Sequence, residues 1–372
     1  MKNKINNCDF LIVGAGLIGS LTAITLIKKN FKVVVIDKNR FKYNDNRTLA
    51  VNANSRDFLK SLSLWSKLSE KFEDINKIVI GDYINSESLH FGDKEAMGSV
   101  IFNNDLLKIA HNELKKGKCI YDQINLDLSK LRINETVKIK NELFSFKKII
   151  LSVGKKFSGL HNVVKYNYEN EHKSYVGFFN HTFNHNNIAY EYFTKKGPLA
   201  VLPAPKRDKK LSTFIFSTKK NMEHSQLNIL LKQFFSKTHG KIKLNKNIYN
   251  FNISPHLSNN LNSEYILLGD SLRSIHPVAG QGWNLGVKDI QDLLSILNLY
   301  SIENANLSQI FHSKRLPENL SYLFFTNIIN SLYDNKREIN SFVIKFGYKS
   351  LLKFSFLRKL FIKQAMGRLK LI

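Results

Sequence analysis

At the start of the chain, apolar and polar positions fall into blocks that predict a strand, a helix and a second strand. Residues 10–13 form a short continuous apolar run, which is typical of a strand buried on both faces. Residues 17–29 carry apolar side chains at helical spacing, and residues 31–36 form a second run rich in β-branched side chains. This order predicts a β-α-β unit.

Three glycines occupy the turn between the first strand and the helix. Gly14, Gly16 and Gly19 have the G-x-G-x-x-G spacing, which permits a tight turn, a close approach of backbone to a pyrophosphate, and close helix–strand packing. The helix N-terminus presents free N–H groups to the phosphates. Asp37 closes the second strand, where a carboxylate accepts hydrogen bonds from a ribose. The pattern predicts a dinucleotide site and leaves NAD and FAD open; a purely structural turn is the alternative.

A second apolar run, at residues 265–268, ends in Gly269 and Asp270. A glycine-containing loop follows, and residues 283–299 have the pattern of a helix. An acid at a strand end can hold a polyol hydroxyl, and a glycine loop before a helix can offer N–H groups to an anionic ligand. Two such sites, far apart in the sequence, favour a long ligand such as FAD over NAD alone. The alternative is a turn and a helix cap without a ligand.

The composition is that of a folded protein. Hydrophobic residues make up 43% of the 372 residues, which excludes global disorder. No apolar run is long enough to span a bilayer. The short apolar run near the N-terminus leads directly into the glycine motif, so it is interpreted as a strand and not as a secretion signal.

Charge and metal-ligand residues narrow the possible partners. The net charge is +26, and a positive charge favours anionic partners. No nucleic-acid-binding motif is present, so we do not expect nucleic acid to bind. Cys8 and Cys119 have no metal or disulfide spacing. His181 and His185 have no third ligand group nearby, so we expect no metal site.

Residues 269–286, GDSLRSIHPVAGQGWNLG, resemble the G-D-A-A-H-x-x-H-P-x-A-G-Q-G-x-N-x-G signature of the class A flavin monooxygenases. Their Ala-Gly-Gln-Gly and Asn-Leu-Gly segments are similar to those of the ubiquinone-biosynthesis hydroxylases. Residues 45–50 (DNRTLA), 197–203 (GPLAVLP) and 364–367 (QAMG) match further segments of that family, so that the resemblance covers nearly the whole chain.

The resemblance implies a role for each matching residue. By this resemblance, the ADP half of FAD would be bound by Gly14, Gly16, Gly19 and Asp37. Arg47 would approach the diphosphate and the flavin edge, and Asp270 would bind the ribityl chain. The pyrimidine end of the flavin would be covered by Gly280, Gln281, Gly282 and Asn284. His276 and Pro277 belong to the loop that faces the flavin, with no side-chain acid or base assigned. A helix dipole behind that loop would stabilise negative charge on the reduced cofactor.

Two positions depart from the family pattern. The family usually carries an Asp-Gly pair, followed by Ser and Arg, after a mid-chain strand. Here residues 149–160 read IILSVGKKFSGL, so that Ser158 remains but Gly154, Lys155 and Lys156 replace the pair. We therefore expect slow use of NADPH or NADH, the electron donor that the family implies. Arg273 stands where many relatives have His.

The family architecture implies an α/β fold with a Rossmann-like FAD-binding domain interleaved with a mixed-sheet substrate domain, plus C-terminal helices. The expected FAD domain comprises residues 1–76, 101–165 and 256–335, and the substrate domain residues 77–100 and 166–255. Residues 77–80, 200–202 and 211–216 have strand patterns of their own.

The C-terminal segment, residues 336–372, is predicted to be helical, basic and amphipathic. From 341 onward it contains six Lys, two Arg and no acid, and it is rich in Phe, Leu and Ile. In one continuous helix Lys345, Lys349 and Lys353 share a stripe, with Val343, Leu351, Phe354 and Phe361 largely opposite. Such a helix suits an anionic membrane surface, and the alternative is a helix that docks on the protein's own core.

The sequence thus predicts an FAD-dependent monooxygenase that uses dioxygen to hydroxylate a polyprenylated phenol in ubiquinone biosynthesis. We expect it in the cytoplasm, peripheral at the inner face of the membrane and within reach of a ubiquinone-biosynthesis complex. The alternatives are a same-fold enzyme acting on small aromatics or prenyl groups, and a non-catalytic, assisting FAD-binding subunit of a membrane-associated complex.

Overall fold

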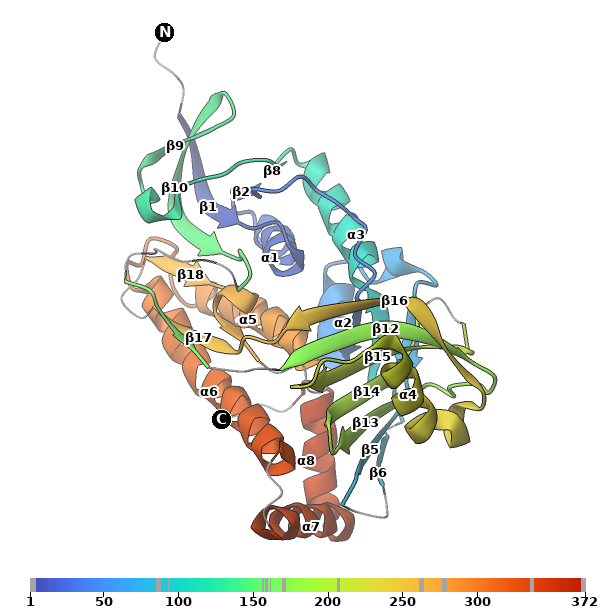
Figure 1. Ribbon diagram of the computed structural model, residues 1–372. Helices are drawn as coiled ribbons and strands as arrows, with labels where there is room; N and C mark the ends of the chain where they lie inside the picture. The colour runs from blue at the N-terminus through green and yellow to red at the C-terminus, as the bar shows by residue number, and fades with distance from the viewer. Residues whose placement is uncertain are drawn as a thin grey trace.

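Two large β-sheets lie side by side, and helices pack around the first sheet and along one end of the molecule (Figure 1). The computed structural model describes residues 5–84, 88–92, 94–155, 157, 160, 162–168, 172–205, 208–260, 264–275, 280–334 and 338–368, without the side chains of 329–342. Within this part of the chain, no helix combines the length and the apolar character that crossing a membrane requires.

The first sheet is parallel apart from one edge hairpin. Its strands in spatial order are β18 (Tyr265–Leu267), β10 (Glu142–Leu151), β1 (Ile5–Val13), β2 (Val33–Ile36) and β8 (Ile120–Tyr121), with β9 (Thr136–Ile139) antiparallel on β10. The helices α1 (Leu17–Ile27), α3 (Asn103–Lys116) and α5 (Gln281–Leu297) accompany it, and α1 contacts both others. The predicted β-α-β unit is confirmed.

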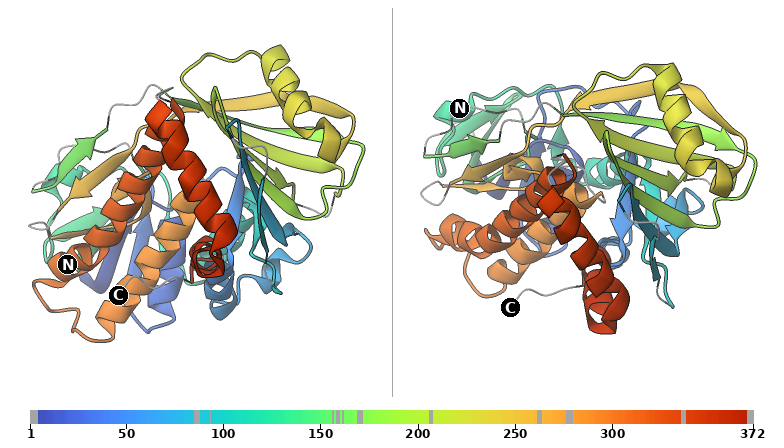
Figure 2. Two further views of the ribbon diagram at one scale, coloured as in Figure 1. Left: turned by 90° about the horizontal axis from the view of Figure 1, so that it is seen from below. Right: turned by 60° about the horizontal axis from the view of Figure 1, so that its bottom comes forward.

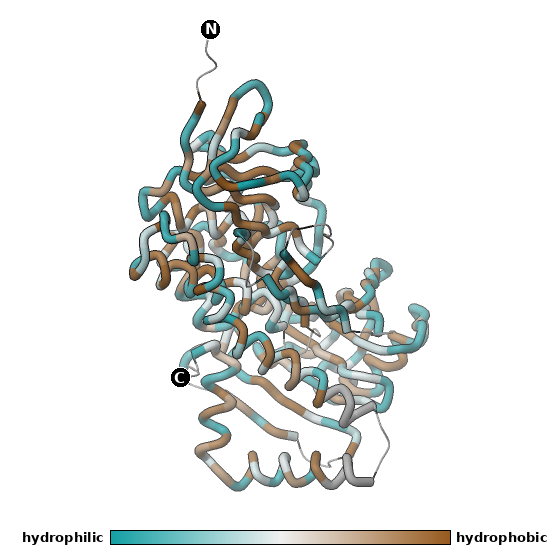
Figure 3. Tube along the Cα trace, turned by 90° about the vertical axis from the view of Figure 1, so that its left-hand side faces the viewer, coloured by the Kyte–Doolittle hydropathy of each residue, from teal (hydrophilic) through white to brown (hydrophobic). Residues whose placement is uncertain are grey.

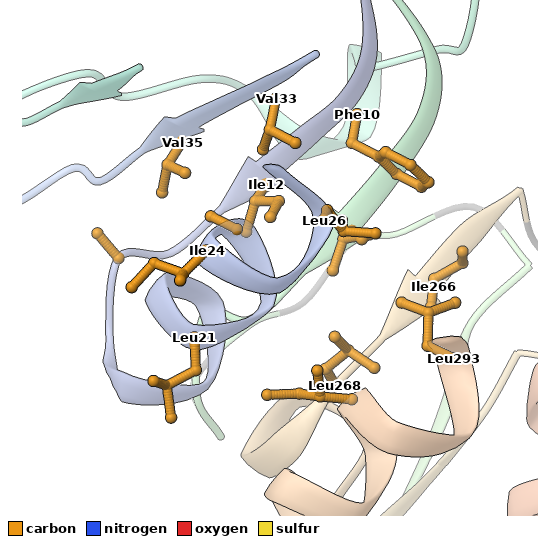
Figure 4. Close-up of a cluster of buried hydrophobic side chains, with 14 of the residues drawn as sticks. Phe10, Ile12, Leu21, Ile24, Leu26, Val33, Val35, Ile266, Leu268 and Leu293 are labelled. Atoms are coloured by element: carbon orange, nitrogen blue, oxygen red, sulfur yellow. The ribbon is translucent and has the colours of Figure 1, made fainter. Parts of the chain in front are cut away.

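The main core lies between this sheet and its helices. Side chains from β1, β2, α1, β18 and α5 meet there, as Figure 4 shows for Phe10, Ile12, Leu21, Val35, Ile266 and Leu293. Helix α1 is apolar on almost every side because the sheet, α3 and α5 surround it, and its buried positions run from Leu17 to Leu26. This packing fixes the position of the turn between β1 and α1.

The second large sheet has seven strands and is mixed, as predicted. Its spatial order is β16 (Ile242–Asn252), β12 (Lys173–His181), β15 (Leu211–Thr218), β14 (Gly197–Pro203), β13 (Ile188–Thr194), β5 (Lys77–Asp82) and β6 (Leu89–Gly92). Only the β13–β5 pair is parallel among its described pairings. Helix α4 (His224–His239) covers one face, where Phe235 packs with Phe179, Phe214 and Phe216. The strands predicted at 77–80, 200–202 and 211–216 are confirmed.

Two small sheets and short helices join the large sheets. One is β3 (Thr48–Asn52), β7 (Gly98–Phe102) and β4 (Phe72–Ile75); the other is β11 (Val164–Asn167), β17 (His256–Asn259) and β19 (Arg273–Ser274). Helix α2 (Ala53–Ser61) and the 3-10 turns Ser66–Leu68, Leu128–Lys130 and Gly269–Ser271 complete these connections.

The C-terminal region is helical, but one expectation about it is wrong. Helix α6 (Leu307–Asp334) runs beside α5 and the first sheet and leads to α7 (Glu338–Lys353) and α8 (Ser355–Ala365), which lie at one end of the molecule (Figures 1 and 2). The continuous helix expected past residue 350 is interrupted at Phe354, whose backbone is extended. Leu351 and Phe361 therefore pack on the protein, whereas Val343 and Phe354 are exposed.

Candidate cofactor site

Two of the fingerprint glycines are required by packing. Gly14 has a φ of +104°, and a Cβ there would lie 2.2 Å from the carbonyl oxygen of Ser152 at the end of β10. A Cβ on Gly19 would lie 1.9 Å from the carbonyl oxygen of Gly14. Both substitutions would collide with backbone, so these two glycines allow α1 to approach the strands closely.

Gly16 is different, because its Cβ position is open. No atom lies within 4 Å of that position, and Gly16 is the N-cap residue of α1. The first N–H groups of the helix have no partner within the helix and point out of its N-terminus. Gly16 therefore leaves room for an anionic group to reach this helix end.

Asp37 is held in place at the end of β2. Its Oδ2 accepts a hydrogen bond of 2.9 Å from the backbone N–H of Ala15, and its Oδ1 accepts one of 2.8 Å from Asn39. The carboxylate thus braces the glycine turn and also lines the adjacent cavity. A ribose bound there would meet a preoriented acceptor.

A single cavity of about 1110 Å³ connects the predicted residues from both ends of the sequence. The predicted residues that line it are Gly14, Gly16, Asp37, Arg47, Asp270, Gly280 and Gly282. The cavity continues to Leu202 of β14 and Ile215 of β15, in the seven-stranded sheet. It is therefore long, polar at the glycine turn and apolar where it reaches the second sheet.

Asp270 lies in the turn after β18, and its side chain is open to the cavity. The cavity walls surround this carboxyl, and burial raises its pKa, whereas the charges of Arg273, Lys155 and Arg47 act in the opposite direction. An acid in this setting can accept hydrogen bonds from ligand hydroxyl groups.

Arg47 occupies the cavity beside the seven-stranded sheet. Its guanidinium pairs with Asp45, with Nη2 2.6 Å from Oδ2, and lies 5.6 Å from the ring centre of Phe251. Burial of Asp45 would raise the pKa of its carboxyl, but hydrogen bonds from the Arg47 side chain and backbone outweigh this and lower that pKa. Asp45 thus holds the Arg47 guanidinium at the cavity wall.

The start of α5 is organised by Asn284, which does not itself line the cavity. Gly280 has a φ of +62°, and its carbonyl accepts a hydrogen bond of 3.1 Å from the Asn284 side-chain amide. The same amide donates to the carbonyl of Ala50, and its oxygen accepts from the backbone N–H of Asn52. Asn284 therefore ties the glycine loop to β3. Gln281 also lies outside the cavity lining, so direct cofactor contacts by these two side chains stay predictions.

Comparison with known proteins shows which enzymes this chain resembles. A family model described as an FAD binding domain matches residues 7–116. The ubiquinone biosynthesis monooxygenase COQ6 of Dictyostelium discoideum is 23% identical, over 98% of this chain and 92% of that protein. The ubiquinone hydroxylase UbiL of Rhodospirillum rubrum is 25% identical, over 98% of this chain and 90% of that protein. These matches indicate an FAD-dependent monooxygenase that is similar, over nearly its full length, to proteins named for ubiquinone hydroxylation.

A solved structure shows that this monooxygenase has the fold of other flavin enzymes. p-Nitrophenol 4-monooxygenase PnpA from Pseudomonas putida superposes with a TM-score of 0.76, at 13% identity, over 99% of this chain and 100% of that chain. The likeness extends over both sheets and the C-terminal helices, so that the predicted fold class is confirmed.

The cavity of the monooxygenase fits FAD. Gly16 leaves open the space that a diphosphate would fill, next to the N-terminus of α1. The buried Oγ1 of Thr48 and Oδ1 of Asn104 have no hydrogen-bond partner within the described residues, and both residues line the cavity. Because buried polar atoms are nearly always paired in folded proteins, these two atoms indicate a polar ligand. The length of the cavity, with its polar end at the glycine turn and its apolar end beside the second sheet, matches a dinucleotide that ends in a flavin.

Sequence reasoning missed several residues of this site, among them Thr48, Asn104, Ser152 and Trp283, which line the cavity. Thr48 follows the matched Arg47, and Trp283 lies between the predicted Gly282 and Asn284, so adjacency in the sequence was an available signal for both. Asn104 comes from α3, which only the tertiary fold brings to the cavity. His276 and Pro277, together with Lys156 and Ser158, lie outside the described residues, and their assigned roles stay predictions. Within the described part of the chain, no group of His, Cys, Asp and Glu side chains could hold a metal ion.

Proposed function

We propose that this monooxygenase hydroxylates the aromatic ring of a polyprenylated phenol in ubiquinone biosynthesis. The observation that carries the substrate class is the match, over nearly the full length of the chain, to relatives named for ubiquinone hydroxylation. The site supports it, because the apolar end of the cavity, lined by Leu49, Leu202, Ile215 and Trp283, suits an apolar aromatic ring.

The residues of the chain have distinct tasks in this reaction. FAD, when bound, carries electrons from a nicotinamide donor to dioxygen and so supplies the oxidising chemistry. Gly16 and the N-terminus of α1 would hold its diphosphate, Asp37 its ribose, and Asp270 its ribityl hydroxyls. The apolar wall of β14 and β15 would position the substrate ring and exclude water from it.

The electron donor in this proposal is NADPH or NADH, used slowly. The segment that replaces the family's Asp-Gly pair is engaged in a contact between the two sheets, because Lys155 Nζ donates a hydrogen bond of 2.9 Å to the carbonyl of Asn252 at the end of β16. This contact supports the view that Lys155 braces the cavity rim and does not receive the donor.

In this proposal the enzyme is located at the inner, cytoplasmic face of an anionic membrane, which it contacts through residues 341–372. It also associates with other enzymes of ubiquinone biosynthesis. Ubiquinone precursors with polyprenyl chains partition into bilayers, so an enzyme that lies on the membrane meets them there.

Deletion of the gene tests the proposed function. Mass spectrometry of the quinone fraction should then show a polyprenylated phenol lacking one ring hydroxyl, and the gene restored on a plasmid should remove it. A plasmid carrying the Gly16→Val variant should not. An unchanged quinone fraction would exclude this function, and rescue by the Gly16→Val variant would point to an assisting role that does not need FAD.

A further inference from the structure

Exposed apolar side chains are concentrated on the C-terminal helices. Nine of the twenty large apolar side chains that are exposed in the described part of the chain lie between Leu320 and Phe356. On α6, Leu320, Phe324 and Ile328 follow one another at intervals of four residues and so share one stripe, with Phe325 beside it. Phe324 is 70% exposed. Monomeric soluble proteins rarely leave such a cluster uncovered without a function for it.

These helices are anchored to the protein by their opposite faces. On α6, Leu323 is buried with Leu257 and Leu285. On α7, the Tyr348 hydroxyl donates a hydrogen bond of 2.7 Å to the carbonyl of Ile80 and accepts one of 3.2 Å from the N–H of Leu89. Packing on the core therefore explains one face of each helix and leaves the exposed face unexplained.

Positive charge accompanies the exposed aromatic side chains. Lys345, Lys349 and Lys353 are exposed on α7, where Phe346 is 66% exposed. No acidic side chain of the described residues forms an ion pair with these lysines. Apolar and polar positions alternate along the helices near the C-terminus in Figure 3, and Figure 2 shows α6 and α7 together on the face seen from below.

The charge decides between the possible occupants of this surface. A second copy of the chain would bring two strongly basic faces together, in a protein whose net charge is already +26. A bilayer with anionic lipids offers negative charge at its surface and an apolar layer just below it. On α7 the exposed Lys345 and Lys349 flank the exposed Phe346 in sequence, and this pairing of charged and apolar side chains matches that order of charge and apolar depth.

We propose that α6, α7 and α8 together form a docking face for an anionic lipid bilayer, in which phenylalanines of α6 enter the bilayer beside the lysines of α7. This docking face comprises Leu320, Phe324, Phe325, Phe346, Phe354 and Phe356, with Lys345, Lys349 and Lys353. The docking face rests on the proposed function, because that function supplies the lipid substrate. It extends the membrane contact proposed for residues 341–372 to α6.

Sedimentation of the full-length, FAD-loaded protein with vesicles tests the docking face. Wild-type protein should bind vesicles that contain phosphatidylglycerol and should bind pure phosphatidylcholine at least roughly tenfold more weakly. Phe324→Ser combined with Phe325→Ser should weaken binding roughly tenfold or more, because less apolar surface enters the bilayer. The binding that remains should still fall as salt is added.

Two further variants separate the contributions. Lys345→Gln combined with Lys349→Gln should also weaken binding to anionic vesicles, and the remaining binding should be less sensitive to salt. Ile229→Ser is the matched control, since Ile229 is 64% exposed on α4, away from the C-terminal helices (Figure 1), and it should bind like wild type. Circular dichroism shows whether each variant is folded.

Binding by the folded Phe324→Ser, Phe325→Ser protein equal to that of wild type would overturn the docking face, and so would equal binding to neutral and anionic vesicles. A concentration-dependent dimer that these serines abolish would assign the surface to a second copy instead. Hydroxylation of a detergent-solubilised short-chain prenylphenol separates this inference from the proposed function: activity without vesicle binding would contradict the docking face alone, and vesicle binding without activity would contradict the function alone.

Discussion

The guanidinium of Arg273 lies 2.6 Å from Oδ2 of Asp289, and both side chains are buried. The same carboxylate oxygen accepts a hydrogen bond of 3.0 Å from the backbone N–H of Gly269, and Oδ1 accepts one of 2.8 Å from Arg315 Nε. Asp289 of α5 thereby fixes the turn that presents Asp270 to the cavity. The arginine that departs from the family pattern is thus part of the support of the cofactor site.

Asp289→Asn should destabilise the protein by about 3–5 kcal/mol, because it removes the charge that compensates two buried guanidinium groups. Urea denaturation of the two proteins measures this difference. Asp292→Asn is the matched control, since Asp292 pairs with the same Arg315 but is 19% exposed, and it should cost clearly less. Equal stability of Asp289→Asn and wild type would show that Asp289 does not hold the turn.

Gly16→Val and Gly19→Val should differ in kind. At Gly16 the added side chain enters open space, so the variant should fold, with a melting temperature near that of wild type, yet fail to retain FAD. At Gly19 the side chain meets the carbonyl of Gly14, so the variant should lose stability itself. Circular dichroism and the flavin absorbance of purified protein separate the two outcomes. A yellow, FAD-saturated Gly16→Val protein would contradict the assignment of the diphosphate site.

His312 should make the protein sensitive to mild acid. Its Nδ1 donates to the carbonyl of Ser308 and its Nε2 accepts from the N–H of Leu267, so the ring is neutral, and burial lowers its pKa to about 4. Because the unfolded chain takes up this proton near the ordinary pKa of 6.5, stability is complete above that pH and declines as the pH falls to about 4. The expected loss is roughly 3 kcal/mol for this group.

Urea denaturation at several pH values between neutral pH and pH ~5 measures how the free energy of unfolding declines with pH. This range lies between the pKa of the histidine in the unfolded chain and its lowered pKa in the folded protein. His312→Gln should be less stable at neutral pH but should show a shallower decline toward acid. His256 and His239, whose pKa values burial lowers to about 4 and about 3, should preserve part of the slope in that variant. An identical slope in both proteins would exclude His312 as a source of the acid sensitivity.

Reduction of the bound FAD by NADPH should be slow in the isolated protein, because Lys155 is engaged with Asn252 where the family carries its Asp-Gly pair. Anaerobic stopped-flow mixing, with and without a prenylated phenol, measures the rate. Faster FAD reduction in the presence of the phenol would show that bound substrate promotes electron transfer from the donor. If no donor reduced the FAD, the non-catalytic alternative would be favoured. Fast reduction by NADPH alone would contradict the expectation and show that the lost pair is dispensable.

The sequence predicted those parts of the site whose residues lie close together in the chain. The turn at Gly14 to Gly19, Asp37 at the end of β2 and the turn at Asp270 each follow from spacing within a short segment, and the cavity brings these segments together. Three strands of the seven-stranded sheet, at residues 77–80, 200–202 and 211–216, were also predictable, because each segment has a local strand pattern.

Contacts between distant segments were not predictable in this way. The need for glycine at position 14 depends on Ser152, which directly follows β10, and the task of Asn284 depends on Ala50 and Asn52 of β3. A helical pattern continues through Phe354, but docking of α7 and α8 on β5 and β6 overrides it and breaks the helix there. Tertiary packing, which a single sequence does not encode locally, decides each of these.

The central claim is tested most directly by one reaction with the purified, FAD-loaded protein. The protein is incubated with a chemical or photochemical reductant, a short-chain prenylated phenol and isotopically labelled dioxygen, and the products are analysed by mass spectrometry. The account predicts a phenol that carries one added ring hydroxyl whose oxygen comes from dioxygen, and no such product with Gly16→Val. Consumption of dioxygen to hydrogen peroxide alone, with the phenol recovered unchanged across a series of prenylated phenols, would contradict it.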